Sequence, residues 1–175
     1  MLAGSFRLVT ARLIPRAYRC KQALLLAVLI LSGCGGSGQS KAQEWQAVTT
    51  SSFHFRAPKA WRVTVASGRT TVKDGSDFVQ VAIFPLAHPY TASLFQRVQS
   101  ELGVRMAAVA RASKGSVAAH HVVTVDGSKS HAYDVRVGNR TDRYTFLLRD
   151  KREFLLVCSA GADVCDELAA SFVAG

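Results

Sequence analysis

The chain has 175 residues, of which 49% are hydrophobic and 19% charged, and this balance excludes a disordered polypeptide and a fibrous repeat protein. Its formal net charge of +10 is unevenly placed, because residues 1–33 contain five basic and no acidic side chains, which leaves 17 basic and 12 acidic residues in the remainder. That remainder has no basic run longer than two residues and no basic motif interleaved with aromatic residues, so we expect no nucleic-acid partner.

The N-terminal segment has the order of an export signal. Five positive charges precede an apolar run of nine residues at positions 23–31. This run is too short to cross the hydrocarbon layer of roughly 30 Å as a helix, but it matches the apolar part of a signal peptide, about 7 to 15 residues. We therefore predict a cleaved signal peptide over residues 1–33. An ordinary secretory signal and an uncleaved membrane helix are the weaker alternatives.

The apolar run ends in Leu31-Ser32-Gly33-Cys34, which resembles a bacterial lipobox. The resemblance implies that Cys34 becomes the mature N-terminus and carries a diacylglyceryl group on its sulfur. A thiolate is the nucleophile that such a lipid transfer needs, and two acyl chains give stable anchoring where one chain does not. We therefore expect a lipoprotein on the extracytoplasmic side of the cell membrane, with Cys34 as its lipidation site.

The segment after the lipobox is predicted to be a spacer. Residues 34–51 are expected to contain the lipidated cysteine and a flexible tether, because Gly-Gly-Ser-Gly-Gln-Ser-Lys has nothing to bury. A single globular domain is expected over residues 52–175, which is long enough for one hydrophobic core. Short apolar alternations bounded by turn residues predict its first strands at residues 53–55, 61–66 and 77–84.

The apolar period then changes to that of a helix over residues 90–112. Five apolar side chains, spaced 3, 4, 4 and 3 residues apart, form one stripe: Phe95, Val98, Leu102, Met106 and Val109. This spacing predicts a long helix that packs one face on a core. A stripe of this kind is more typical of packing than of a ligand site.

The second half reads as an antiparallel meander. Its strands are separated by connections short enough for hairpins and are predicted at residues 120–125, 130–137, 140–149 and 153–159. A closing helix is predicted to begin near Asp163 as its N-cap.

Two of the four cysteines lie before the domain, and the two within it are predicted to form one disulfide, Cys158–Cys165. Strand alternation places Cys158 on the same face as Phe154 and Leu156. Cys165 falls on the apolar face of the closing helix, so the pair should meet where this helix packs on the sheet. Buried thiols without a disulfide and a metal site are the alternatives.

The order of these elements, with Phe-x-Phe-x-x-Pro-x-x-Trp from Phe53 to Trp61 and a closing Ser171-Phe172, resembles the PsbP-like domain of many small bacterial lipoproteins. The resemblance implies an α+β fold, an α/β/α sandwich in which an antiparallel sheet is flanked by the long middle helix and the C-terminal helix. It also implies binding and assembly rather than catalysis. The matching residues are core or turn positions, so they identify no partner.

Histidines are the remaining candidates for chemistry. His120 and His121 are adjacent in a predicted strand, so they point to opposite faces and cannot hold one metal ion together. Depending on the hairpin register, one of them lies beside His131 or Asp134. The sequence contains neither a Gly-x-Ser-x-Gly elbow nor a phosphate loop between a strand and a helix. We expect no catalytic residues, no metal and no cofactor.

These observations predict a monomeric, non-catalytic binding or envelope-associated module. Its expected partners are the membrane, through the diacylglyceryl group on Cys34, and an envelope protein or small ligand that the sequence does not specify. One alternative is a carrier of a hydrophobic ligand, which requires a cavity lined by Phe, Leu and Val between the sheet and a helix. Another is a small extracytoplasmic hydrolase, in which His120 or His121 meets a carboxylate and a nucleophile in a cleft.

Overall fold

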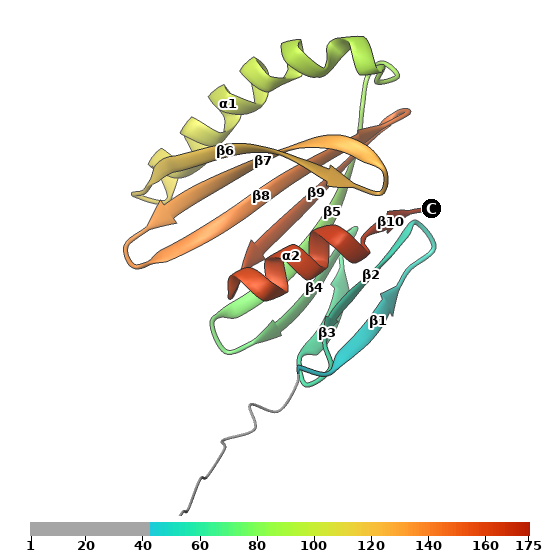
Figure 1. Ribbon diagram of the computed structural model, residues 1–175, viewed down its shortest axis with the longest axis vertical. Coiled ribbons are helices and arrows are strands. Elements are labelled where there is room, and N and C mark those ends of the chain that lie inside the picture. The colour runs from blue at the N-terminus through green and yellow to red at the C-terminus, as the bar shows by residue number, and fades with distance from the viewer. Residues whose placement is uncertain (1–42) are drawn as a thin grey trace, which may run out of the picture. The chain divides into compact units, whose positions relative to one another are not determined.

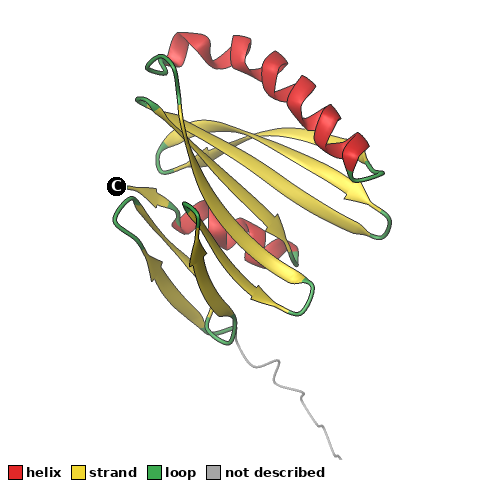
Figure 2. Ribbon diagram, turned by 180° about the vertical axis from the view of Figure 1, so that it is seen from behind, coloured by secondary structure: helices red, strands yellow, loops and turns green. Residues whose placement is uncertain are grey.

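The computed structural model describes residues 43–175, so the predicted signal peptide, the lipidation site Cys34 and the tether up to residue 42 lie outside the described residues. Within residues 43–175 the chain is α+β, with ten strands in two antiparallel sheets and two α-helices (Figure 1, Figure 2).

The larger sheet consists of seven strands, β3 (Arg62–Ala66), β4 (Arg69–Asp74), β5 (Asp77–Pro85), β6 (Ser116–Val125), β7 (Ser128–Val137), β8 (Arg140–Arg149) and β9 (Arg152–Ser159). Their spatial order is β3-β4-β5-β9-β8-β7-β6, and every neighbouring pair is antiparallel. The predicted meander therefore forms one half of the sheet, and the early hairpins form the other.

The smaller sheet contains β1 (Trp45–Thr49), β2 (Phe53–Pro58) and the short C-terminal β10 (Val173–Ala174), in the order β1-β2-β10. The prediction that the tether extends to residue 51 was wrong for this segment. All five residues of β1 pair with β2, and Val48 is only 4% exposed because its side chain lies in the core. The fold therefore begins near Trp45.

The long helix α1 (Phe95–Ala112), preceded by one turn of 3-10 helix at Ala92–Leu94, packs over β6 and β7 on one face of the larger sheet (Figure 1). The predicted stripe is confirmed, because Leu102 and Met106 are buried and Val98 packs against them. Helix α2 (Ala162–Ser171) packs on β9 and β2.

The predicted N-cap of α2 was wrong by two residues. Gly161 occupies the N-cap position, and its carbonyl oxygen accepts hydrogen bonds from the N–H groups of Val164 and Cys165. Asp163 lies instead in the first turn of the helix, where its negative charge is favourable beside the N-terminal helix dipole.

The two faces of the larger sheet bury separate cores. The larger core includes Phe55, Phe154 and Phe172, and it joins the larger sheet to α2 and the smaller sheet. The smaller core, around Met106 and Phe146, lies beneath α1. The predicted α+β class is confirmed, but the predicted sandwich of one sheet between two helices needs correction. Strands dominate the fold, because a second sheet shares one face with α2.

Candidate functional site

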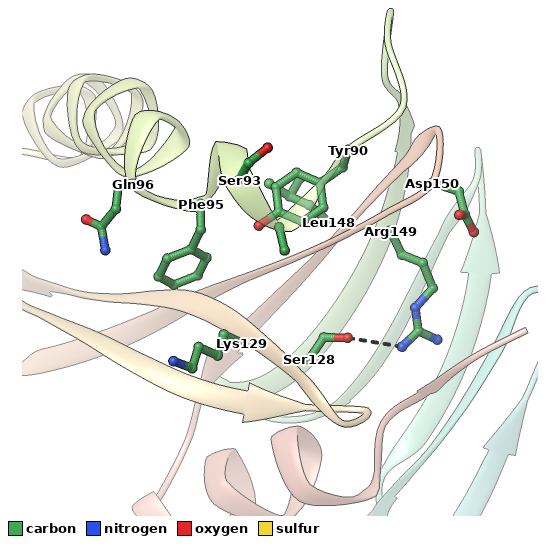
Figure 3. Close-up of a pocket in the computed structure, with 10 residues that line it drawn as sticks. Tyr90, Ser93, Phe95, Gln96, Ser128, Lys129, Leu148, Arg149 and Asp150 are labelled. Atoms are coloured by element: carbon green, nitrogen blue, oxygen red, sulfur yellow. Dashed lines mark hydrogen bonds between the residues drawn. The ribbon is translucent and has the colours of Figure 1, made fainter.

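A groove lies between α1, the loop before it and the end of the larger sheet at which β8 turns into β9. It consists of an outer pocket of about 670 Å³ and an inner pocket of about 290 Å³. Both pockets are lined by Tyr90 and Leu148, so they adjoin each other, and we call the pair the α1 groove. Figure 3 shows the outer pocket, with Phe95 and Gln96 on one side and Lys129 and Ser128 on the other.

The wall of the α1 groove is held in place by backbone hydrogen bonds. The N–H of Leu86 donates to the carbonyl oxygen of Lys151 at 2.8 Å, and the N–H of Tyr90 donates to that of Asp150 at 2.6 Å. Burial raises the pKa of the Tyr90 phenol, which therefore stays protonated at neutral pH. The loop that precedes α1 is thus fixed to the turn between β8 and β9.

The inner pocket is mainly apolar. It lies between α1 and the sheet, and its aliphatic lining comprises Leu86, Leu94, Val98, Leu102 and Leu148. This is the kind of space that a carrier of a hydrophobic ligand requires, although the lining contains Leu and Val without Phe.

An ion pair between the exposed Arg105 and the buried Glu153 contributes to the polar part of the inner pocket. Arg105 Nη1 donates to both carboxylate oxygens of Glu153, at 2.7 and 2.9 Å. The guanidinium also lies over the rings of Phe84 and Phe146, 5.8 and 5.1 Å from their centroids. Glu153 is only 7% exposed. Its charge is therefore compensated within the fold, and neither partner is available as an isolated charge for a ligand.

Two cations line the outer pocket. Arg149 forms an ion pair with Asp126, and it also donates to the Asp126 carbonyl oxygen at 2.9 Å and to Ser128 Oγ at 3.3 Å. Lys129 is exposed, and within residues 43–175 no ion pair involves it. The outer pocket thus combines two aromatic side chains with Lys129 and Asp150, which carry opposite charges and form no ion pair within residues 43–175.

His120 and His131 lie beneath the first turn of α1, next to the outer pocket. His131 is 1% exposed, and the ring of Phe95 stacks on it at 3.9 Å between centroids. Its Nε2 donates to the carbonyl oxygen of Phe95 at 3.0 Å, which leaves Nδ1 to accept from Nε2 of His120 at 3.1 Å. Burial, and secondarily the neighbouring His131 and His121, lower the pKa of His120.

His121 points to the opposite face, as strand alternation predicts. Its Nε2 lies 3.0 Å from Asp134 Oδ2, and Arg143 donates to Asp134 at 2.9 Å and to Asp166 of α2 at 2.9 Å. Burial acts to raise the pKa of Asp134, but the hydrogen bonds from Arg143 and His121 outweigh it and hold this pKa below its usual value. The expected neighbours are confirmed by side-chain contacts, because His120 lies beside His131 and His121 beside Asp134.

The hydrolase alternative requires a histidine, a carboxylate and a nucleophile, and the network around His121 supplies the first two. His121 meets a carboxylate, but its hydrogen bonds within the described residues include no hydroxyl or thiol. In residues 43–175 no three His, Cys, Asp or Glu side chains are grouped so that they could hold a metal ion. No helix of this part of the chain is long and apolar enough to span a bilayer.

Cys158 and Cys165 lie at disulfide distance, with their sulfur atoms 2.05 Å and their Cα atoms 5.5 Å apart. The pair joins β9 to the first turn of α2, at the position that strand alternation and helical spacing indicate. Both side chains are almost completely buried. The predicted lipidation site Cys34 lies outside the described residues.

The α1 groove itself did not follow from the sequence. Tyr90 and Leu148 are 58 positions apart, and they meet only because the loop before α1 folds back on the turn after β8. The one local signal is the loop 85–90, in which two prolines and a tyrosine follow a strand. Such a loop indicates an irregular connection but not what it packs against.

No protein-family model matches the chain, and no curated protein matches it. Among solved structures, it is similar to the solution structure of cyanobacterial PsbP (CyanoP) from Synechocystis sp. PCC 6803, with 18% identity and a TM-score of 0.58, over 83% of this chain and 99% of that chain. A crystal structure from Bacteroides thetaiotaomicron VPI-5482 is more distant, with 11% identity and a TM-score of 0.49, over 70% of this chain and 45% of that chain. The first likeness shows that the fold is PsbP-like and α+β.

Proposed function

We propose that the protein is an exported lipoprotein, anchored through Cys34, whose PsbP-like domain is a non-catalytic module that binds a ligand or an envelope protein in the α1 groove. The observation that carries this proposal is the groove, because its two pockets adjoin at Tyr90 and Leu148 and its wall is fixed by backbone hydrogen bonds. Preformed, largely apolar hollows with a few polar groups are typical of binding sites.

The arrangement of the histidines supports a non-catalytic role. His131 holds α1 on the sheet through its Nε2, which donates to Phe95, and its Nδ1 accepts a hydrogen bond from His120 of β6. His121 belongs to a network that joins β7, β8 and α2 through Arg143. These contacts account for all three side chains as parts of the scaffold.

A carrier of a hydrophobic ligand is the second candidate. It is favoured by the inner pocket, whose five aliphatic side chains lie between α1 and the sheet. In that case the ligand would be a small apolar molecule and not a protein. The mass of the captured species separates the two candidates.

Site-specific photocrosslinking tests the groove in cells that produce the lipoprotein. A photoreactive amino acid is placed at Ala92, which lines the outer pocket, and in a control at Ala108, which is exposed on α1 outside both pockets. We expect a discrete adduct from position 92 and none from position 108, with its mass identifying a protein or a small molecule. Equal adducts at both positions, or none at position 92, would contradict the proposal.

A further inference from the structure

One face of the larger sheet is uncovered over β3 and β4. Helix α1 packs over β6 and β7 at the far edge (Figure 1). The strand register places Arg62, Lys73 and Arg69 on the same face as the α1 side of the sheet, because Arg62 pairs with Lys73 and Ala66 with Arg69. All three cationic side chains are exposed. We call these three residues and the hollow between β3 and β5 the β3–β4 face.

The charge of the β3–β4 face is uncompensated. In the part of the chain that the structure describes, no ion pair involves Arg62, Arg69 or Lys73. The nearest acidic residues in sequence are Asp74 and Asp77, which lie opposite each other in the register of β4 and β5. Asp74 directly follows Lys73 in its strand, so both acidic side chains point to the opposite side of the sheet from Lys73. The face therefore presents three positive charges and no negative one.

The same face contains a polar hollow of about 360 Å³ around Arg69, lined by Thr64, Ala66, Ser67, Arg69, Thr71 and Gln80. Gln80 Nε2 donates to Thr71 Oγ1 at 2.9 Å, so the hydroxyl hydrogen of Thr71 can point into the hollow. A guanidinium surrounded by hydroxyl donors is a typical environment for a phosphate group.

The described chain begins near the start of β3, in the smaller sheet, which packs on the opposite face of the larger sheet. The carbonyl oxygen of Glu44 accepts from the N–H of Lys59 at 2.9 Å, and Gln46 Nε2 donates to the carbonyl oxygen of Trp61, the residue before Arg62. Nine residue steps separate Gln43 from Cys34. Covalent geometry limits these steps to about 30 Å in any conformation. A lipid on Cys34 would therefore keep the domain near the bilayer without selecting one of its faces.

From these observations we infer that the β3–β4 face docks on the anionic surface of the membrane in which Cys34 is anchored, with a lipid phosphate in the hollow at Arg69. This inference rests on the proposed lipid anchor, which keeps the domain near the bilayer surface and raises its local concentration there. Each Lys or Arg near an anionic bilayer strengthens binding about fivefold.

Vesicle sedimentation tests the inference without the anchor. Residues 34–175 with Cys34→Ala, which contain both cores, are mixed with vesicles of phosphatidylcholine alone or with about one third phosphatidylglycerol. We expect binding to the anionic vesicles that weakens as salt rises, and little binding to the neutral ones. The combined change Arg62→Glu, Arg69→Glu and Lys73→Glu should weaken binding at least tenfold.

The matched control carries Arg97→Glu, Arg111→Glu and Arg136→Glu, three exposed positions away from this face with the same change in net charge. Its binding should stay within about threefold of the parent, and circular dichroism should show both variants folded. If the charge-reversed face unfolds the domain, glutamine at the same three positions replaces it. Equal weakening by both sets, or no binding to anionic vesicles, would overturn the inference.

Titration with inorganic phosphate separates a lipid surface from a soluble anion. Calorimetric binding of phosphate without binding to anionic vesicles would assign the hollow to a soluble ion and overturn membrane docking. Because Cys34 is absent from this experiment, its failure would leave the proposed anchor untouched. Failure of the anchor, measured by fractionation of the full chain, would in turn leave the vesicle result standing.

Discussion

At the scale of single residues, His131 of β7 ties the larger sheet to α1 through one ring nitrogen. Its Nε2 donates to the carbonyl oxygen of Phe95, and its Nδ1 accepts from Nε2 of His120 on the neighbouring strand β6. Burial, and secondarily the neighbouring His131 and His121, lower the pKa of His120, because a charged ring is unfavourable in this contact. The contact between His120 and His131 therefore favours a neutral imidazole at His120.

Stability should consequently fall in mild acid. The pKa of His120 in the fold is lowered from 6.5, so His120 binds a proton more readily in the unfolded chain than in the folded one. Proton binding therefore favours the unfolded chain as the pH falls below 6.5. The contribution of His120 should be complete above pH 6.5 and disappear as the pH falls through the lowered pKa. Urea unfolding followed between pH 8 and pH 5 measures this loss.

His120→Gln should make the loss smaller in the same pH range, whereas His54→Gln, a change of an exposed strand residue, should leave the pH profile of the parent unchanged. A profile that is identical in all three proteins would contradict the role of His120.

At the scale of elements, α2 is attached to the rest of the fold by several contacts of different kinds. Cys165 lies at disulfide distance from Cys158 of β9. Glu167 pairs with Arg56 of β2 at 2.7 Å, and Asp166 with Arg143 of β8 at 2.9 Å. The two ion pairs are partly exposed and contribute little individually, so the sulfur pair and the buried apolar side chains hold the helix in place.

Removal of the sulfur pair should weaken the fold without abolishing it. For a closed loop of eight residues, the chain-entropy model gives a loss of about 2 kcal/mol in the free energy of unfolding. The variant Cys158→Ala with Cys165→Ala should show this loss in urea unfolding, and the parent treated with reductant should match it. Equal stability of all three proteins, with two reactive thiols in the untreated parent, would show that no disulfide forms.

The elements that the sequence predicts are those with a local signal. The meander of β6 to β9 follows from alternating side chains and from turns such as Asp126-Gly127, where both residues have positive φ. Strand β4 was missed because Val72 is the one large apolar residue in RTTVKD. β1 was missed because its polar neighbourhood resembles a tether, although Val48 is buried.

At the scale of the whole molecule, strand alternation with helical spacing places the expected sulfur pair, and alternation places His120 and His121 on opposite faces, but the candidate sites could not be predicted. The α1 groove depends on a loop that folds back over a distant turn. The β3–β4 face depends on which face of the sheet α1 covers. Both are results of long-range packing, for which strand and helix periods carry no information.

The proposed lipid anchor is the central claim, because it would determine the compartment of the domain and keep the domain near the bilayer. The most direct measurement is the intact mass of the protein extracted from the membrane fraction of cells that produce the full chain. We predict a chain that begins at Cys34 and carries a diacylglyceryl group, and a Cys34→Ala variant that lacks this modification. A chain cleaved elsewhere without lipid, or a Cys34→Ala variant that remains acylated and membrane-bound, would contradict the account.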